Sequence, residues 1–283
     1  MIDTHLHLWN RAKFQYPWLA GIAELNREFT LQDYRHTVSE EITASLFVEC
    51  AAGADSFFDE ARWALDLASG PENRIAGVVA AVWPERPDFE ENISRLAGHP
   101  KLKGIRRVMH TQPDELSQAP QFRGNIRRLG RFGFTFDLCV LQRQLGVALE
   151  LVRACPGTMF VLDHCGVPDI AHNAAPHGEG FIAWRRAVIA LAAEPNLHGK
   201  ISGLTTYAAE GQRTEDGLRC YVDTMLESFG PERLVWGGDW PVVNLGSGLA
   251  RWCTMTRKML GGLSADEQAK IFSANARVLY KLT

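Results

Sequence analysis

The sequence lacks the features that mark membrane proteins and disulfide-rich secreted proteins. No apolar run approaches the length of about 20 residues that a membrane-spanning helix needs. None of the six cysteines forms a CxxC pair, which argues against a zinc ribbon or a redox dithiol. Because the candidate site residues begin at Asp3, we expect no signal peptide and a soluble, cytoplasmic protein with reduced cysteines.

An excess of charge of one sign is also absent. Lysine and arginine number 30 against 33 aspartates and glutamates, giving a formal net charge of -3. The densest basic cluster is too short to follow a nucleic-acid backbone but suits one small anionic or carbonyl-bearing ligand; it contains Lys101, Lys103, Arg106 and Arg107. We therefore expect a small-molecule partner, with neither nucleic acid nor membrane; the pattern gives no oligomeric state.

Short apolar runs alternate with amphipathic stretches along the whole chain. Eight runs predict strands buried on both faces: Ile2–Leu8, Ala44–Cys50, Ile75–Val82, Leu102–Val108, Thr135–Val140, Met159–His164, Leu197–Ser202 and Leu234–Gly238. Strands alternating with helices favour parallel pairing, and closing such a sheet gives an α/β (β/α)8 TIM barrel, one domain over residues 1–283. A doubly wound open sheet is the competing fold, but no glycine-rich phosphate loop follows the first strand.

The segments between the strands carry helix signals. The predicted helices cover Ser56–Ser69 before the Gly70-Pro71 stop, Leu141–Ala154, Phe181–Ala193, Leu218–Phe229 and a last helix that opens on the capping-box pattern Ser264-Ala265-Asp266-Glu267. Two long segments do not fit the alternation, Asn10–Glu41 and Gly166–Gly180. Both follow strand ends, so we expect both over the C-terminal face of the barrel, where active sites lie.

The first strand carries the strongest chemical signal. Residues i and i+2 of a strand share a face, so Asp3, His5 and His7 are predicted to point into the barrel. Two adjacent imidazoles can bind a metal or polarise a carbonyl, and Asp3 below them can hold a histidine tautomer. The alternative interpretation is a pair of structural histidines, which is less consistent with three such residues at period two.

Asp239 follows the last strand in Gly237-Gly238-Asp239-Trp240-Pro241. A carboxylate at the C-terminal end of a barrel strand is placed to act as a general base or metal ligand, although a turn-capping aspartate is the simpler alternative. Near the end of the sixth strand, alternation lets only one of Asp163 and His164 face inward. We favour His164, with Asp163 between strand and helix.

Basic and acidic side chains on three other strands are candidates with open alternatives. Arg106 and His110 share one face of the fourth strand, and Arg106 can hold a substrate oxygen unless it is solvated at the surface. Glu49, which follows an apolar run, is either a site residue or the first loop residue. Lys200 on the seventh strand is a candidate for a buried basic site residue.

The remaining chemistry is narrowed by missing motifs. There is no GxSxG elbow, no HExxH helix and no Walker loop, and no organic cofactor is expected. What remains is water activated by a carboxylate while histidine, arginine or a metal polarises a carbonyl group. That chemistry hydrolyses ester-like or amide-like bonds.

Taken together, these motifs resemble the amidohydrolase superfamily, and within it the amidohydrolase-related lactonases, which include sugar-acid lactonases and 2-pyrone-4,6-dicarboxylate lactonase. The likeness runs from residue 2 to about residue 280. It rests on Ile2–Trp9, Tyr16–Leu19, Lys103–Arg106, Leu162–Gly166, Lys200–Leu204, Gly238–Val242 and Ile271–Ala276.

The resemblance implies a (β/α)8 barrel and lactone hydrolysis. Asp239 would take a proton from water, while His5, His7, His164 and Arg106 would orient the lactone and stabilise the oxyanion. The resembling lactonases include members with one divalent metal and members without a metal requirement, so the resemblance implies either one metal, zinc above others, on His5, His7, Asp239 and Glu49, or polarisation by His and Arg alone. No fourth-strand lysine fits a pair of metals, because Lys103 faces away from Arg106.

A sugar-derived aldonolactone, such as a fucono-, galactono- or rhamnono-lactone, is the expected substrate. Aromatic faces suit sugar rings, so Trp9 and Trp18 are expected to contact it, with His110 and Lys200 as further substrate-binding residues. Three alternatives remain: a pyrone-dicarboxylate lactonase, a metal-dependent decarboxylase of the same superfamily, and a catalytically silent barrel that binds a sugar acid.

Overall fold

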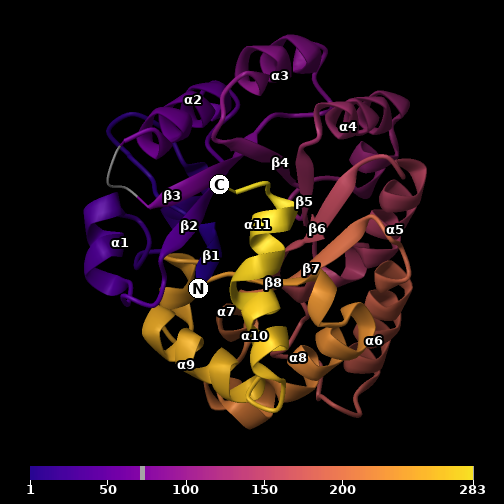
Figure 1. Ribbon diagram of the computed structural model, residues 1–283. Helices are drawn as coiled ribbons and strands as arrows, with labels where there is room; N and C mark the ends of the chain where they lie inside the picture. Colours follow the sequence, from indigo (N-terminus) through magenta and orange to yellow (C-terminus); the bar gives the residue numbers. More distant parts are fainter. Residues whose placement is uncertain (71–73, 283) are drawn as a thin grey trace.

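A computed structural model, which describes residues 1–70 and 74–282, has eight parallel strands in one sheet, each paired with the next along the chain (Figure 1). The strands are β1 (Ile2–Leu6), β2 (Ala44–Val48), β3 (Ile75–Ala81), β4 (Leu102–Val108), β5 (Thr135–Cys139), β6 (Met159–Leu162), β7 (Leu197–Ile201) and β8 (Leu234–Trp236). Beyond the end of β8, Leu6 pairs with Trp240 in a parallel bridge, and the His7 amide donates to the Trp240 carbonyl at 2.8 Å. These contacts close the predicted (β/α)8 barrel.

Each strand begins at the predicted residue, but seven of the eight end one or two residues earlier than predicted. The predicted strands are too long because the apolar pattern of the sequence continues past the last hydrogen bond between the strands. The residues that leave the strand direction there include His7, Glu49, His164 and Asp239. The C-terminal ends of the strands are therefore the places where the backbone turns to present side chains.

A ring of helices surrounds the barrel in Figure 1. The helices are α1 (Leu31–Thr37), α2 (Phe57–Ala68), α3 (Phe89–Ala97), α4 (Pro120–Phe132), α5 (Leu145–Ala154), α6 (Glu179–Ala192), α7 (Leu204–Tyr207), α8 (Glu215–Phe229), α9 (Leu249–Met259), α10 (Ala265–Ala269) and α11 (Asn275–Leu279). The predicted Ser264–Glu267 capping box is present. Pro71, part of a predicted helix stop, lies outside the described residues. No helix within residues 1–70 and 74–282 is both long and apolar enough to cross a membrane.

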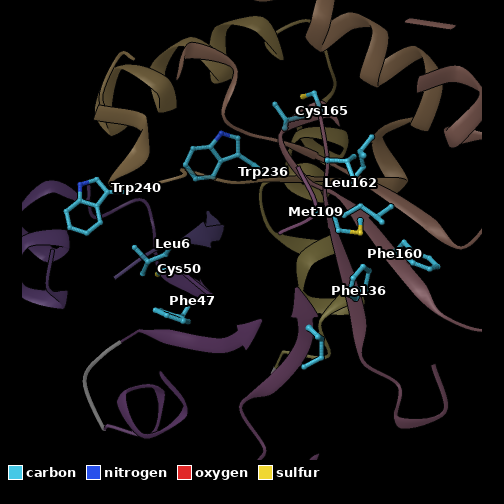
Figure 2. Packing of buried hydrophobic residues seen from close by; sticks show 14 of the residues in the cluster. Leu6, Phe47, Cys50, Met109, Phe136, Phe160, Leu162, Cys165, Trp236 and Trp240 are labelled. Atoms are coloured by element: carbon cyan, nitrogen blue, oxygen red, sulfur yellow. The ribbon is translucent and has the colours of Figure 1, made fainter. Parts of the chain in front are cut away.

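The core has two layers. Between strands and helices, large apolar side chains interlock, and Figure 2 shows Phe136 of β5 beside Phe160 of β6, with ring centroids 6.0 Å apart. Inside the barrel lies a smaller cluster made of Ile2, Leu46, Val48, Val79, Val161, Val235, Ala276 and Tyr280. The C-terminal helices α10 and α11 lie across the near end of the barrel in Figure 1, and Tyr280 is 1% exposed among the inner residues. This filling of the N-terminal end leaves the opposite end for a site.

An irregularity in β1 overturns part of the predicted alternation. Asp3 pairs with Ser45 and Leu6 pairs with Phe47, so three steps along β1 match two steps along β2. Ile2 consequently lies in the inner cluster, whereas Asp3 accepts a hydrogen bond from Tyr34 of α1 at 3.0 Å. The prediction that Asp3 shares the inward face of His5 and His7 was wrong. Asp3 also does not hold a histidine ring, because it accepts from the backbone amides of His5 and Gly238.

The first long segment, Asn10–Glu41, divides between the mouth and the outside of the barrel. The Trp18 indole donates to the Cys50 carbonyl at 2.8 Å, so this part of Asn10–Glu41 lies at the C-terminal end of β2, as predicted. Residues 31–37 instead form α1, whose Tyr34 packs beside β1 and β2 and bonds Ser45 at 2.9 Å. The prediction that the whole segment covers the mouth was therefore wrong for α1.

Candidate active site

His5 and His7 face each other at the mouth of the barrel. Their Nε2 atoms lie 3.1 Å apart, and their rings meet edge to face. The Nδ1 atom of His7 lies 2.8 Å from the Val48 carbonyl, which can only accept a hydrogen bond. His7 therefore carries its proton on Nδ1, and its Nε2 lone pair points toward His5.

Asp239 joins this pair from the end of β8. Its Oδ1 atom lies 3.6 Å from Nε2 of His7 and 3.9 Å from Nε2 of His5, and the residue is 2% exposed. Its backbone φ is +57°, a left-handed conformation that directs the side chain back over the strand end. The two glycines before it are required by space, since a Cβ on Gly237 would lie 2.8 Å from Cβ of His5.

His164 enters the site through a left-handed turn. Four consecutive residues from His164 to Val167 have φ between +44° and +73°, which for three non-glycine residues costs on the order of 1–3 kcal/mol each. The His164 ring lies 4.4 Å from that of His5, and its Nδ1 bonds Ser202 at 2.9 Å. Backbone strain of this kind is typical of functional sites, where the surrounding packing holds it.

Asp163 also points into the barrel, so its predicted place between strand and helix was wrong. Its Oδ2 accepts from Arg106 at 3.3 Å and its Oδ1 lies 2.8 Å from Nζ of Lys200. The alternation rule failed because β6 ends at Leu162, one residue before Asp163. Burial opposes ionisation of Asp163, but Lys200 and then His5 outweigh it and hold the pKa well below its ordinary value.

Arg106 spans the site from β4, on the inward face that the alternation predicts. Its Nε donates to Oε1 of Glu49 at 2.7 Å, and one terminal nitrogen lies 3.1 Å from Nε2 of His5. Its neighbours face outward: Arg107 pairs with Glu85, and Lys103 donates to the Lys281 carbonyl. The alternative of a surface-solvated Arg106 is excluded by its exposure of 4%.

Glu49 is buried in the site, but Arg106 and the backbone take both of its oxygens. Oε1 accepts from Arg106, and Oε2 accepts from the Ala51 amide at 2.7 Å. Among the described residues, the metal-competent groups are His5, His7 and Asp239, and His5, Asp163 and His164. Glu49 therefore forms an ion pair with Arg106 and is absent from the metal-competent groups, in contrast to the prediction that it is a metal ligand.

Lys200 lies inside the barrel with no exposed surface, although the sequence predicts it to contact the substrate. Its Nζ lies 2.7 Å from Oδ2 of Asp137 and 3.2 Å from Nδ1 of His5, and all three side chains are fully buried. Burial opposes the charge on Lys200, yet Asp137 and Asp163 outweigh it and raise the pKa above its ordinary value. Lys200 is therefore a buried cation beneath the histidines.

Two site residues were missed by the sequence analysis. Asp137 is a carboxylate in the apolar β5 run, and its mismatch with that run was the available signal. Tyr207, at the end of α7, gave no signal because it follows β7 in an irregular segment. Its ring centroid lies 6.3 Å from that of His164, and burial followed by the Asp239 charge raises the pKa of its phenol.

Of the residues predicted to contact the substrate, Trp9 is buried, whereas Trp18 and His110 are partly exposed at the mouth. Trp9 is 1% exposed and its indole donates to the Arg27 carbonyl, so it supports the loop from within. Trp18 is half-buried and packs edge to face on Trp9. His110 is also half-buried, 3.4 Å from the Cys139 sulfur, and burial followed by the charge of Arg106 lowers its pKa to about 4. Trp18, His110 and Tyr207 thus form the accessible rim.

The donor atoms at the mouth fit a divalent cation. The Nε2 lone pair of His7 faces Nε2 of His5. A terminal nitrogen of Arg106 lies 3.1 Å from the same Nε2 atom of His5, and a guanidinium group can approach it only as a hydrogen-bond donor. The carboxylates also outnumber the cations, since Arg106 and Lys200 stand against Glu49, Asp137, Asp163 and Asp239. Two positive and four negative charges leave an excess of two negative charges, which one divalent metal neutralises.

His5 and His164 are neutral in the site. Burial, then the charge of Lys200, lowers the pKa of His5 well below its ordinary value. Burial likewise lowers the pKa of His164, against the opposing charge of Asp239. Neutral imidazoles can ligate a metal or hydrogen-bond a carbonyl group, whereas imidazolium ions cannot ligate. The site therefore combines neutral nitrogen ligands with one carboxylate able to accept a proton.

Glu60 of α2 is a fully buried carboxyl behind the site, and it makes folding stability depend on pH. Burial, then the charge of Glu49, raises its pKa from 4.5 to about 8. Because the folded pKa exceeds the unfolded one, its contribution is present below pH 4.5 and is lost as the pH rises through 8. As the pH rises from 5 to 9, the free energy of unfolding of Glu60→Gln should increase relative to that of the native chain by on the order of 3 kcal/mol.

Urea unfolding at both pH values measures this gain. Glutamine keeps an oxygen for the Cys50 amide, which donates to Glu60 at 3.2 Å. The exposed Glu24→Gln is the matched control and should show no pH-dependent difference. A stability difference between Glu60→Gln and the native chain that is the same at pH 5 and at pH 9 would contradict a raised pKa.

Comparison with known proteins identifies the family of the chain. The amidohydrolase family profile matches residues 2–282. The chain belongs to the amidohydrolase family. Two relatives are L-fucono-1,5-lactonases: one from Burkholderia ambifaria is 32% identical, covering 99% of this chain and 95% of the relative, and one from Burkholderia multivorans is 31% identical, covering 99% and 96%.

A solved structure gives the same assignment. A Burkholderia multivorans amidohydrolase crystallised with bound zinc superposes with a TM-score of 0.87 at 29% identity, covering 100% of this chain and 99% of the other. The resemblance to the amidohydrolase-related lactonases that the sequence motifs carry is thereby confirmed at the level of family and fold.

Proposed function

We propose that this protein is a lactonase that hydrolyses a sugar-derived aldonolactone, with L-fucono-1,5-lactone as the first candidate. The observation that carries the proposal is the convergence of Asp239, His5 and His7 within 3.9 Å at the barrel mouth. The names of the two Burkholderia relatives support the substrate class. The half-buried Trp18 and Tyr207 on the rim offer aromatic faces to a sugar ring.

In the proposed reaction Asp239 is the general base. It takes a proton from a water molecule, whose oxygen attacks the lactone carbonyl carbon. The bond between that carbon and the ring oxygen then breaks, and the protonated Asp239 returns the proton to the ring oxygen as it becomes a hydroxyl. The products are one carboxylic acid and one alcohol on the same chain, so every atom of lactone and water is retained.

The other site residues position and polarise. His164 uses Nδ1 on Ser202, which leaves Nε2 as the nitrogen available to the substrate. Arg106 fixes the His5 ring and supplies positive charge near the developing oxyanion. A zinc ion held by His5, His7 and Asp239 would act as a Lewis acid toward the carbonyl oxygen when bound.

A pyrone-dicarboxylate substrate is less consistent with these contacts. Such a substrate needs two basic side chains free to pair with its carboxylates. Arg106 and Lys200 are instead paired with Glu49, Asp137 and Asp163 of the chain itself. No contact in the described residues favours the decarboxylase over the lactonase.

Acid release in a weakly buffered solution with a pH indicator tests the proposal. The panel should hold fucono-, galactono- and rhamnono-lactones, assayed with chelator-treated protein and with the same protein after zinc addition. We expect acid release above the spontaneous rate for at least one lactone, and a loss of at least about tenfold in kcat on zinc removal. No release across the panel, with or without zinc, would refute the lactonase.

A further inference from the structure

The His5 ring separates two cation positions in the barrel. On its Nε2 side lie His7 and Asp239, the candidate metal ligands. On its Nδ1 side lie the Asp163 carboxylate, 3.5 Å away, and the ammonium group of Lys200, 3.2 Å away. His5, Asp163 and His164 form a second metal-competent group that shares His5 with the first. A single histidine therefore serves an upper and a lower position.

The lower position already holds a positive charge. Nζ of Lys200 lies 2.7 Å from Oδ2 of Asp137 and 2.8 Å from Oδ1 of Asp163, with Nδ1 of His5 as the third neighbour. Lys200, Asp137, Asp163 and His5 are each fully buried. Two carboxylate oxygens and an imidazole nitrogen around one point are the ligand types that bind zinc, and each would have to move inward by roughly 1 Å. Zinc at this point would displace the Nδ1 proton of His5 into solvent, so that the ring would bridge the upper and lower positions as an imidazolate.

We propose that Lys200 is a built-in cation that fills a second metal position, so that the native centre can take no more than one divalent ion. Asp163 connects this cation to a second one, because Arg106 binds its other oxygen at 3.3 Å. Lys200 and Arg106 thus bind both oxygens of the Asp163 carboxylate, which a second metal would need as a ligand. This inference is independent of lactone hydrolysis, since it concerns how many metals the barrel can hold.

Two substitutions at Lys200 separate this proposal from a purely structural ion pair. Lys200→Ala removes the ammonium and leaves space among Asp137, Asp163 and His5. Lys200→Met removes the same charge but fills the space with a side chain of similar length. Removal of one partner from a buried ion pair is strongly destabilising, so both variants should melt below the native protein in chelator.

Zinc should distinguish the two variants. Elemental analysis after dialysis against zinc should find one more equivalent in Lys200→Ala than in the native protein, and no gain in Lys200→Met. Thermal melting should rise by roughly 5 °C or more in Lys200→Ala on zinc addition, beyond any rise of the native protein. Adding Asp137→Asn to Lys200→Ala should abolish the extra equivalent, because it removes one of the ligand carboxylates.

The variant Lys103→Ala is the matched control and should keep the native zinc content, since Nζ of Lys103 donates to the Lys281 carbonyl on the outside of the barrel, away from the candidate metal ligands. Equal zinc content in Lys200→Ala and the native protein would overturn the proposal. So would a Lys200→Ala protein that stays unfolded when expressed and purified in zinc, because the metal should replace the lost ammonium. An equal gain in Lys200→Met would also refute it, since that variant leaves no position to fill.

Discussion

Replacing Asp239 by asparagine is expected to lower kcat for lactone opening by about 10³-fold, with a much smaller change in KM. Asparagine keeps the size and one oxygen of the side chain, but it cannot take a proton from water. The carboxylate is 2% exposed and lies 3.6 Å from His7, so no solvent base can substitute for it without rearrangement. The effect should therefore fall on the chemical step rather than on substrate binding.

Steady-state kinetics and zinc content must be measured on the same preparations. A base role predicts that Asp239→Asn stays slow even when its zinc content equals that of the native protein, whereas a role only as metal ligand predicts recovery at saturating zinc. Asp169→Asn, on the exposed loop that follows β6, is the control and should keep the native rate. A fall of less than tenfold in Asp239→Asn at full zinc content would argue against the base.

Replacing Arg106 by methionine is expected to lower the free energy of unfolding by about 3–5 kcal/mol, together with most of the activity. The guanidinium binds Glu49 at 2.7 Å and Asp163 at 3.3 Å, and its loss leaves the Glu49 carboxylate buried without a cation. The His5 ring also loses its neighbour at Nε2, so its orientation is less fixed. Stability and catalysis should therefore fall together.

Denaturant unfolding of a matched set measures this effect. Arg107→Met changes the next residue, a part-buried arginine that pairs with Glu85, and should cost about 1 kcal/mol or less. The double variant Arg106→Met with Glu49→Gln should be more stable than Arg106→Met alone, because the unpaired charge is gone. A single variant as stable as Arg107→Met would contradict the buried pair.

The strand positions could be predicted from the sequence because buried parallel strands are nearly continuous apolar runs. The first residue of each strand follows from where that run begins. The inward face of β4 could also be predicted, since Arg106 and Arg107 obey simple alternation in a regular strand. His5, His7 and Asp239 were predicted to lie together because parallel strands of a barrel end at one face.

The predictions failed where the backbone departs from a regular strand. Asp3 changed face because of one extra residue in β1, and Asp163 turned inward because β6 had already ended. The left-handed turn at His164 depends on tertiary packing, including Gly203, where a Cβ would lie 2.7 Å from the His164 ring. The contact of Lys200 with Asp137 joins residues 63 positions apart, which no local pattern predicts.

In the proposed reaction, water activated by Asp239 opens a lactone at this barrel mouth. The most direct measurement is the rate of acid release from L-fucono-1,5-lactone by the native protein and by Asp239→Asn, each chelator-treated and each zinc-loaded. We predict a rate well above the spontaneous one for the zinc-loaded native protein and about 10³-fold less for the zinc-loaded variant. Equal rates for the two zinc-loaded proteins would contradict the account.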